Sequence, residues 1–350
     1  FESIIKLIAF VAVGLFVTFG MYKGFGDLFL KAAAKPELQE LFAISPSADY
    51  TQWVTLTILS MAAILCLPRQ FHITIVENAG TDHLSKAVWM FPLYLLLINI
   101  FVLPIAIGGL LQFPAGNVDP DTFVLTLPMS TKNEGLALLA YIGGLSAATG
   151  MAVISAIALS TMICNEVLMP TLLRMVWLRL NEPGDLTALV LNLRRSSIVF
   201  IMLLSFGYFV FIGESYTLVT IGLLSFAAAA QFAPVIIGGI FWKGATSQGA
   251  FAGLGLGFAV WIYTLLLPSF ALSGWLPQSF IAEGPFEIAL LKPYEFLGLT
   301  GMDNISHSLF WSMVVNIGFY IWVSINTEQS AIERIQAMIF VDVDKYSGTT

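Results

Sequence analysis

The run of residues 135–165 contains thirty-one consecutive positions without Asp, Glu, Lys or Arg. A membrane-spanning helix needs about 20 apolar residues, at a rise of about 1.5 Å per residue. The run is therefore long enough to cross a bilayer with a strong tilt or to contain a break, and the glycine and hydroxyl residues clustered at 143–150 favour a break. Because such a segment is costly to expose to water, we expect an integral membrane protein.

The composition agrees with a membrane protein and excludes several other classes. Of the 350 residues, 58% are hydrophobic and 11% are charged, which is far outside the range of soluble domains. Basic residues do not cluster beyond Arg194 and Arg195, so no nucleic-acid partner is expected. The three histidines are dispersed, and the chain has no GxSxG, HExxH, Walker or His-rich iron motif. No metal site and no catalytic residue are therefore predicted, and whether the complete protein is an enzyme stays open.

Eight charge-poor stretches predict eight membrane spans, and hence an all-α polytopic fold. The expected spans are 3–22, 50–68, 88–111, 137–164, 196–213, 218–242, 248–267 and 305–326. Eight spans place both ends on one side, and that side carries ten of the fifteen Lys and Arg residues. Because cytoplasmic loops are enriched in Lys and Arg, we predict a multi-pass protein of the inner (plasma) membrane with both ends cytoplasmic.

The chain divides in sequence into a transmembrane domain, 1–326, and a polar tail, 327–350. The tail is interpreted as the start of a cytoplasmic linker toward a signalling region. The chain begins at Phe1 inside an apolar segment and without a Met, so the transmembrane domain is expected to be truncated at its N-terminus.

The stretch 226–255 carries a specific pattern of small, aromatic and basic residues. A small-residue helix is followed by Phe232 and Pro234, then by Trp242 and Lys243, and then by a G-A-x-A-G sequence at 249–253. Proline is expected to interrupt the span, and the Trp–Lys pair to anchor its cytoplasmic end, while the glycines permit a close helix crossing. This pattern resembles the sodium:solute symporter family.

Further segments resemble the subgroup of that family whose symporter-like domain is fused to a sensor histidine kinase. These segments are PRQFHITIVEN at 68–78, LSAATGMAVI at 145–154, GPFEIALLKP at 284–293 and ERIQAMIFVDV at 333–343. The resemblance implies a kinase that follows this chain. ATP would bind only in that kinase region, and a response regulator would be its partner.

The resemblance also implies a leucine-transporter-type fold, built from two inverted five-helix repeats. By order, the first span would be the last helix of the first repeat, spans two to six would be the second repeat, and the last two would be peripheral. Solute and ion sites form between such repeats at the membrane midplane. The chain would then carry half of a site and would not transport alone.

Ionisable residues inside a span are candidates for a coupling site. Glu2 and Lys6 are four residues apart, a spacing that suits a helical ion pair, and the alternative is an interfacial pair whose side chains extend to the headgroups. The resemblance places Glu2 where the family has an Asp associated with sodium coupling, and Lys6 where it has a small residue. We expect the Lys6 ammonium to point toward 146–151 and to replace a bound sodium ion.

Four residues of the fourth span are further coupling candidates through the resemblance. The family's sodium-binding hydroxyl pair aligns with Gly150 and Met151, neither of which offers a hard oxygen ligand. Ser146 and Thr149 lie one turn away and would substitute. Sodium and the proton are therefore the two candidate coupling ions, and the loss of the hydroxyl pair favours the proton.

Two further polar sets lie near the predicted cytoplasmic surface. Gln70 and His72 match a similar pair in the family and are candidates for a gate, or else form an interfacial polar cluster. Ser160 and Thr161 are candidates for solute contact, although they fit helix packing at the inner surface better.

These features together predict the membrane domain of a solute transporter or sensor that works by alternating access and is coupled to a kinase. The solute would be an amino acid or a small carboxylate, and the lipid bilayer is the other partner. One alternative is a stand-alone secondary transporter without a kinase. The other is a receptor that binds solute without moving it.

Overall fold

The computed structural model describes residues 2–42, 50–113, 117–174, 186–212 and 218–341, and within these ranges every regular element is helical. Seven helical stretches are long and apolar enough to span a membrane: 3–21, 82–112, 134–172, 187–211, 218–241, 247–272 and 304–326. An eighth span is formed if the two parts of 50–76, bent by 49° relative to each other, are counted as one. The chain is therefore a multi-pass helical membrane protein, as the sequence predicts.

The bend in the segment 50–76 lies next to a proline. Helix α4 (Tyr50–Cys66) ends two residues before Pro68, which opens the short helix α5 (Pro68–Phe71). Proline has no N–H to continue the hydrogen-bond ladder, and its ring disfavours the helical conformation at the residue before it. The break after Cys66 follows from these two effects.

The chain divides into two compact units. The first contains residues 1–48 and 72–201, and the second contains residues 49–71 and 202–350. Helix α11 (Leu186–Ile212) passes from the first unit into the second. Each unit has its own apolar core.

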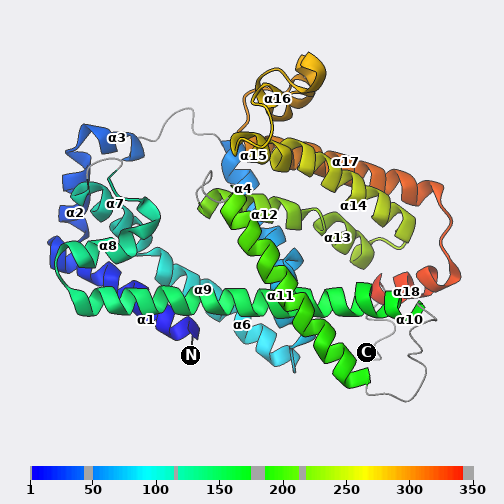
Figure 1. Ribbon diagram of the computed structural model, residues 1–350, viewed down its shortest axis with the longest axis horizontal. Helices are drawn as coiled ribbons and strands as arrows, with labels where there is room; N and C mark the ends of the chain where they lie inside the picture. The colour runs from blue at the N-terminus through cyan, green and yellow to red at the C-terminus, as the bar shows by residue number, and fades with distance from the viewer. Residues whose placement is uncertain (1, 43–49, 114–116, 175–185, 213–217, 342–350) are drawn as a thin grey trace. The chain divides into compact units, whose positions relative to one another are not determined.

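The first unit contains the helices α1 (Glu2–Leu15), α2 (Phe25–Ala33), α3 (Pro36–Phe42), α6 (Thr81–Asn99), α7 (Val102–Gln112), α8 (Phe123–Ser130), α9 (Glu134–Met162) and α10 (Met169–Arg174). In this unit, α1 and α8 pack against α9, and α7 packs against α2 and α8 (Figure 1). Val13 and Val17 from the N-terminal helical segment pack with Ile105, Phe123 and Leu127, which come from α7 and α8. This core fixes the helices that surround the candidate residues of α1 and α9.

Helix α9 is continuous, so the break expected at 143–150 is not formed. The glycine cluster instead serves close packing, because a Cβ at Gly143 would collide with the Cβ of Ala9 on α1. Gly150 is also buried, on the same side of α9 two turns later. Small residues at this spacing let two helices approach closely without interrupting either one.

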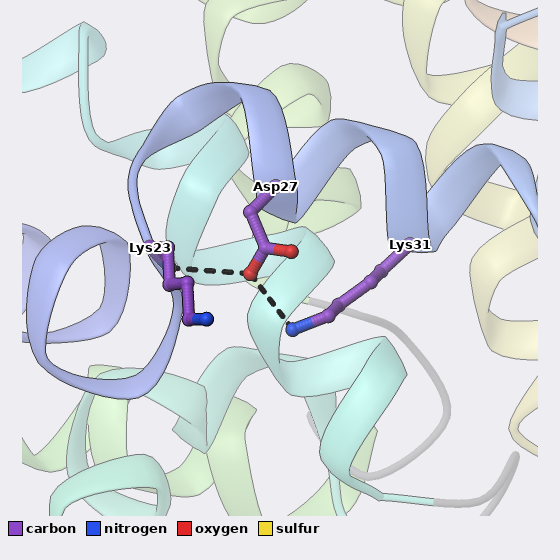
Figure 2. Close-up of polar contacts among 3 residues, drawn as sticks. All are labelled: Lys23, Asp27 and Lys31. Carbon is purple, nitrogen blue, oxygen red and sulfur yellow. Dashed lines mark hydrogen bonds and ion pairs between the residues drawn. The ribbon is translucent and has the colours of Figure 1, made fainter.

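The start of α2 is organised by one carboxylate (Figure 2). Asp27 accepts a hydrogen bond from the backbone N–H of Lys23, at 3.2 Å, and pairs with the ammonium of Lys31 at 2.7 Å. The hydrogen bond from Lys31 is the main reason why the pKa of Asp27 lies below its usual value of 3.8. An acidic residue in the first turn also stabilises the helix through the helix dipole.

The second unit contains α4, α5 and the helices from 218 to the end of the described chain. These are α12 (Leu218–Ala230), α13 (Ala233–Phe241), α14 (Ser247–Trp261), α15 (Leu267–Leu272), α16 (Ser279–Ala282), α17 (Asn304–Asn326) and α18 (Ala331–Val341). The core between α4 and α12 combines leucines with small side chains, with Leu59 and Ala62 on one helix and Leu224, Ala227 and Ala230 on the other. Small side chains in this position bring the two backbones close together.

Helices α14 and α17 lie side by side along most of their lengths (Figure 1). A glycine faces α17 at every fourth position of α14, namely Gly249, Gly253 and Gly257. A Cβ at Gly249 would collide with Ser324, and a Cβ at Gly253 would lie 2.6 Å from the backbone oxygen of Asn316. Residues four apart form one ridge on a helix, so this glycine row is a groove that receives α17. The close crossing predicted for Gly249 and Gly253 is confirmed.

The span 218–241 is interrupted where the sequence predicts it. Helix α12 ends at Ala230 and α13 begins at Ala233, with a turn at Gln231 and Phe232 between them. Pro234 stands in the first turn of α13, where its missing N–H costs nothing because that N–H has no partner within the helix. The predicted interruption by Pro234 is confirmed.

Candidate functional site

The structure places Lys6 beside α9 but directs its ammonium toward an aromatic ring. Lys6 is half-buried and lines a hollow of about 580 Å³, together with Gly143, Gly144, Ala147 and Ala148 of α9. Its Nζ lies 5.7 Å from the centre of the Tyr94 ring, which is cation–π distance. Among the described residues, no hydrogen bond joins this ammonium to Ser146 or Thr149.

The other coupling candidates on α9 have different environments. Gly150 is buried and Ser146 is half-buried, whereas Thr149 and Met151 are exposed on the surface of the first unit. The Thr149 hydroxyl donates to the backbone carbonyl of Leu145 on its own helix, at 2.7 Å. The hydroxyl is thus satisfied locally, as is usual for Thr inside a helix. The side chain of Glu2 lies outside the described residues, so its predicted pairing with Lys6 remains a prediction.

The gate and solute candidates have the following local environments. His72 lies 3.2 Å from the carboxylate of Glu77, a residue that the sequence did not single out. Gln70 is half-buried and belongs to the second unit, whereas His72 begins the following segment of the first. Ser160 is buried and donates to the backbone carbonyl of Ile157, and Thr161 is half-buried. The hydroxyl of Ser160 therefore serves its own helix, which agrees with the packing interpretation.

A buried polar network lies at the interruption between α12 and α13, and the sequence analysis missed it. The side-chain amide of Asn316 on α17 donates to the backbone oxygen of Gln231 at 2.8 Å and to its Oε1 at 3.2 Å. The side-chain amide of Gln231 in turn donates to the hydroxyl of Ser312 at 2.8 Å and to the carbonyl of Ala227 at 3.3 Å. All three side chains in this network are fully buried.

The network lies where the end of α12 meets α14 and α17. A Cβ at Gly257 of α14 would lie 2.6 Å from Gln231 Oε1 and 2.8 Å from both Cβ and Nδ2 of Asn316. Only glycine therefore leaves room for both amides. The Oδ1 atom of Asn316 is buried and has no hydrogen-bond partner within the described part of the chain. A buried acceptor without a partner costs free energy. The packing and hydrogen bonds around Asn316 must therefore offset this cost.

One signal in the sequence marks this network. Polar or aromatic-hydroxyl residues recur at every fourth position of the last span: Ser308, Ser312, Asn316, Tyr320 and Ser324. All five are buried. Residues four apart lie on one helix face, so the row predicts a polar face turned into the protein. The partners of this row, Gln231 and the α14 glycines, are distant in sequence and could not be assigned from spacing alone.

A second polar assembly joins the end of α17 to the ends of α13 and α14. Gln329 donates to the backbone carbonyls of Lys243 at 2.5 Å and of Ala245 at 2.7 Å. The Glu333 carboxylate accepts from the backbone N–H of Ser247 at 2.9 Å and from that of Ser330 at 2.7 Å. One carboxylate therefore caps two helices, α14 and its own α18. These hydrogen bonds, with Ser247 first and Ser330 second, lower the pKa of Glu333 from 4.5 to about 2.

The chemistry of both assemblies is that of neutral amides, hydroxyls and one carboxylate. Such groups position helices and bind polar solutes through hydrogen bonds. Among the described residues, no group of three His, Cys, Asp or Glu side chains is gathered as metal ligands. Cys66 and Cys164 are both free and buried.

Comparisons of the chain with protein-family models, with curated proteins and with solved structures return no match. The geometry and the hydropathy therefore carry the assignment, which is that of a multi-pass helical membrane protein with an interrupted span and a buried amide network.

Proposed function

We propose that the chain is the membrane domain of a solute transporter or solute sensor of the sodium:solute symporter type. The observation that carries this proposal is the interruption of the span 218–241 at Gln231, in the middle of the apolar stretch, with buried amides gathered around it. Polar groups inside a membrane are costly and mark functional positions by default. Transporters commonly build their moving parts from discontinuous helices.

The network gives the interruption a physical role. The turn at Gln231 and Phe232 removes backbone groups from the regular helical ladder, and the Gln231 carbonyl is satisfied by Asn316 of α17 instead. A hydrogen bond between side chain and backbone is easier to exchange than a continuous helix is to break. The two halves, α12 and α13, are thereby able to tilt separately, as alternating access requires.

In this proposal the fold is of the leucine-transporter type, and the solute is an amino acid or a small carboxylate. Both chain ends are cytoplasmic, on the excess of Lys and Arg on that side. Gln329 and Glu333 form a clamp that ties the first residues after α17 to the end of α13 and the start of α14. This clamp supports the idea that a movement of these spans is passed on through α18 to the chain that follows. A histidine kinase beyond residue 350 would receive that output, and a transporter without a kinase is the alternative.

The proposed coupling ion is the proton, with Lys6 as the residue that replaces sodium. Support for this part comes from the position of Lys6 against the Gly143–Gly144 face of α9 and from the contact of its ammonium with the Tyr94 ring. Uptake by the complete protein is then expected to be insensitive to sodium. Lys6→Ala should abolish the dependence of uptake on a pH gradient while leaving solute binding measurable.

The test uses the complete gene product, purified and reconstituted into vesicles. A panel of labelled amino acids and small carboxylates is assayed for uptake and, in parallel, for stabilisation of the purified protein against heat. Uptake of one class of solute supports a transporter, and stabilisation without uptake supports the receptor alternative. If no solute of either class is taken up or stabilises the protein, the proposal is wrong. Sequencing beyond residue 350 shows directly whether a kinase follows.

A further inference from the structure

Helix α18 begins immediately after the last span. Helix α17 ends at Asn326, residues 327–330 make the connection, and α18 follows from Ala331 to Val341. The connection is too short to carry α18 far from the point where α17 ends, since four extended residues reach at most about 14 Å.

Three hydrogen bonds fix the beginning of α18 to the ends of two other spans. Gln329 donates to the carbonyls of Lys243 and Ala245, which follow the last residue of α13, and Glu333 accepts from the N–H of Ser247, the first residue of α14. The ends of spans mark the level at which the chain leaves the hydrocarbon of the bilayer. Trp242 lies at the same level and lines a polar crevice with Arg334, and both residue types are typical of a membrane interface.

Two faces of α18 have opposite surroundings. Glu333, Ala337 and Val341, spaced four residues apart, are half-buried. A second stripe, formed by Ile332, Ile335 and Ile339, is 69%, 55% and 51% exposed. Three large apolar side chains on one side of a short helix that is tethered at the ends of membrane spans would be unfavourable in water.

We propose that α18 lies flat in the membrane interface and inserts the stripe Ile332–Ile335–Ile339 between the lipid headgroups and the acyl chains. An amphipathic helix at this level buries its apolar face about 5–10 Å into that boundary. The charge of α18 indicates which force holds it at the membrane. Only Glu333 and Arg334 are ionisable within 331–341, so the net charge of the helix is zero. The Glu333 carboxylate already accepts hydrogen bonds from two backbone N–H groups. Binding is therefore driven by apolar insertion and does not require anionic lipid.

A second copy of the chain is the competing occupant of the stripe. Isoleucines at spacings of three and four fit the seam of a coiled coil, but such a seam needs sustained heptads, and the described part of α18 offers three positions in eight residues. The tether at the span ends holds these three positions at the bilayer surface. The lipid interface is the occupant that this geometry favours.

The experiment places a fluorescent label at single cysteines in the complete protein, with Cys66 and Cys164 replaced by Ala, in nanodiscs of phosphatidylcholine. Ile335→Cys and Ile339→Cys report on the stripe, and Arg334→Cys reports on the polar side as the matched control. Lipids with a quencher near the headgroup should abolish most of the emission at 335 and 339, and aqueous iodide should quench mainly at 334. Adding anionic lipid should leave this pattern unchanged.

Three results would overturn the proposal. The first is equal quenching by iodide at 334, 335 and 339, which would place the stripe in water. The second is self-quenching between fluorescent labels at 335 on two copies, or spin–spin coupling when a spin label replaces the fluorophore, which would make the stripe a dimer contact. The third is lipid quenching that occurs only with anionic lipid, which would make the attraction electrostatic. Two independent stripe positions keep the test valid if one label perturbs the helix.

Discussion

The side-chain amide of Asn316 donates a hydrogen bond to the backbone carbonyl of Gln231, 2.8 Å away, at the point where α12 ends. The two residues are separated by 85 positions in sequence, so this bond ties the last span to the interruption of an earlier one. Both side chains are fully buried. The bond therefore compensates a backbone group that the helix itself leaves without its regular partner.

Replacing Asn316 by Ala should destabilise the second unit. The change removes the donor to two buried oxygens of Gln231, and leaving buried acceptors unsatisfied costs about 1–3 kcal/mol. The free energy of unfolding in detergent micelles measures the effect. Asn326→Ala is the matched control on the same helix, because the exposed Asn326 amide bonds only to the Trp322 carbonyl one turn earlier. The control should change stability by about 0.5 kcal/mol or less. Equal effects of the two changes would contradict the role given to Asn316.

Adding one methyl group at Gly257 should also destabilise the protein. In Gly257→Ala the new Cβ would meet Gln231 Oε1 at 2.6 Å, and overpacking of this kind costs about 1–3 kcal/mol. Gly255→Ala is the control, because its Cβ would meet no atom within 4 Å. In a helix interior that change should be neutral or should stabilise by up to about 1 kcal/mol. The midpoints of thermal unfolding of the two variants are compared. A destabilised Gly255→Ala would contradict the assignment of Gly257, and not Gly255, to the face of α14 that contacts α17.

Acid should release the clamp between α18 and α14. The pKa of Glu333 is lowered in the folded protein to about 2 from 4.5, so its contribution is complete above pH 4.5 and is lost as the pH falls from there toward 2. The protection factor of the Ser247 N–H, which is the exchange rate of a free amide divided by the measured rate at the same pH, follows the release. Glu333→Gln should lower that protection factor at neutral pH and flatten its acid dependence, whereas Glu328→Gln should leave the profile of the original protein. A profile that is unaffected by Glu333→Gln would show that another group controls this contact.

The orientation of the chain is tested by labelling cysteines from one side of the membrane. Glu283 and Arg334 are both exposed, and they lie on opposite sides if both chain ends are cytoplasmic. In intact cells, a membrane-impermeant maleimide should label Glu283→Cys and should reach Arg334→Cys only after lysis. The native thiols Cys66 and Cys164 are buried and give a low background. The reverse labelling pattern would exclude the predicted topology.

The positions of the spans could be predicted from the sequence because the length of an apolar run follows directly from the thickness of a bilayer. The interruption near Pro234 was predictable for a similarly local reason, since proline acts on its own helix. The break expected in α9 was wrong because a glycine has two uses. Gly143 receives Ala9 of α1 in a close helix contact, and only the tertiary structure distinguishes that use from a break.

The candidate sites were harder to predict, because their partners are distant in sequence. Lys6 was visible as an unusual charge, but its neighbour Tyr94 was not. Asn316 stood in a row of polar residues at every fourth position, which marks a buried face, yet nothing local connects it with Gln231. Hydrogen bonds across long separations depend on how helices pack, and packing is the step that a single sequence does not determine.

The role of the Asn316–Gln231 bond is best tested by measuring solute uptake in the complete protein when the bond is altered without changing the size of the side chain. Asn316→Asp keeps the size of the side chain and removes the amide donor, and Asn326→Asp repeats the same chemistry at the exposed end of α17. Thermal unfolding first confirms that each variant is folded. We then predict that Asn316→Asp lowers the uptake rate by about tenfold or more, which corresponds to about 1.4 kcal/mol. Asn326→Asp should leave the uptake rate unchanged. Full uptake by a folded Asn316→Asp variant would contradict the claim that the interrupted span and its amide network form the working centre of this membrane domain.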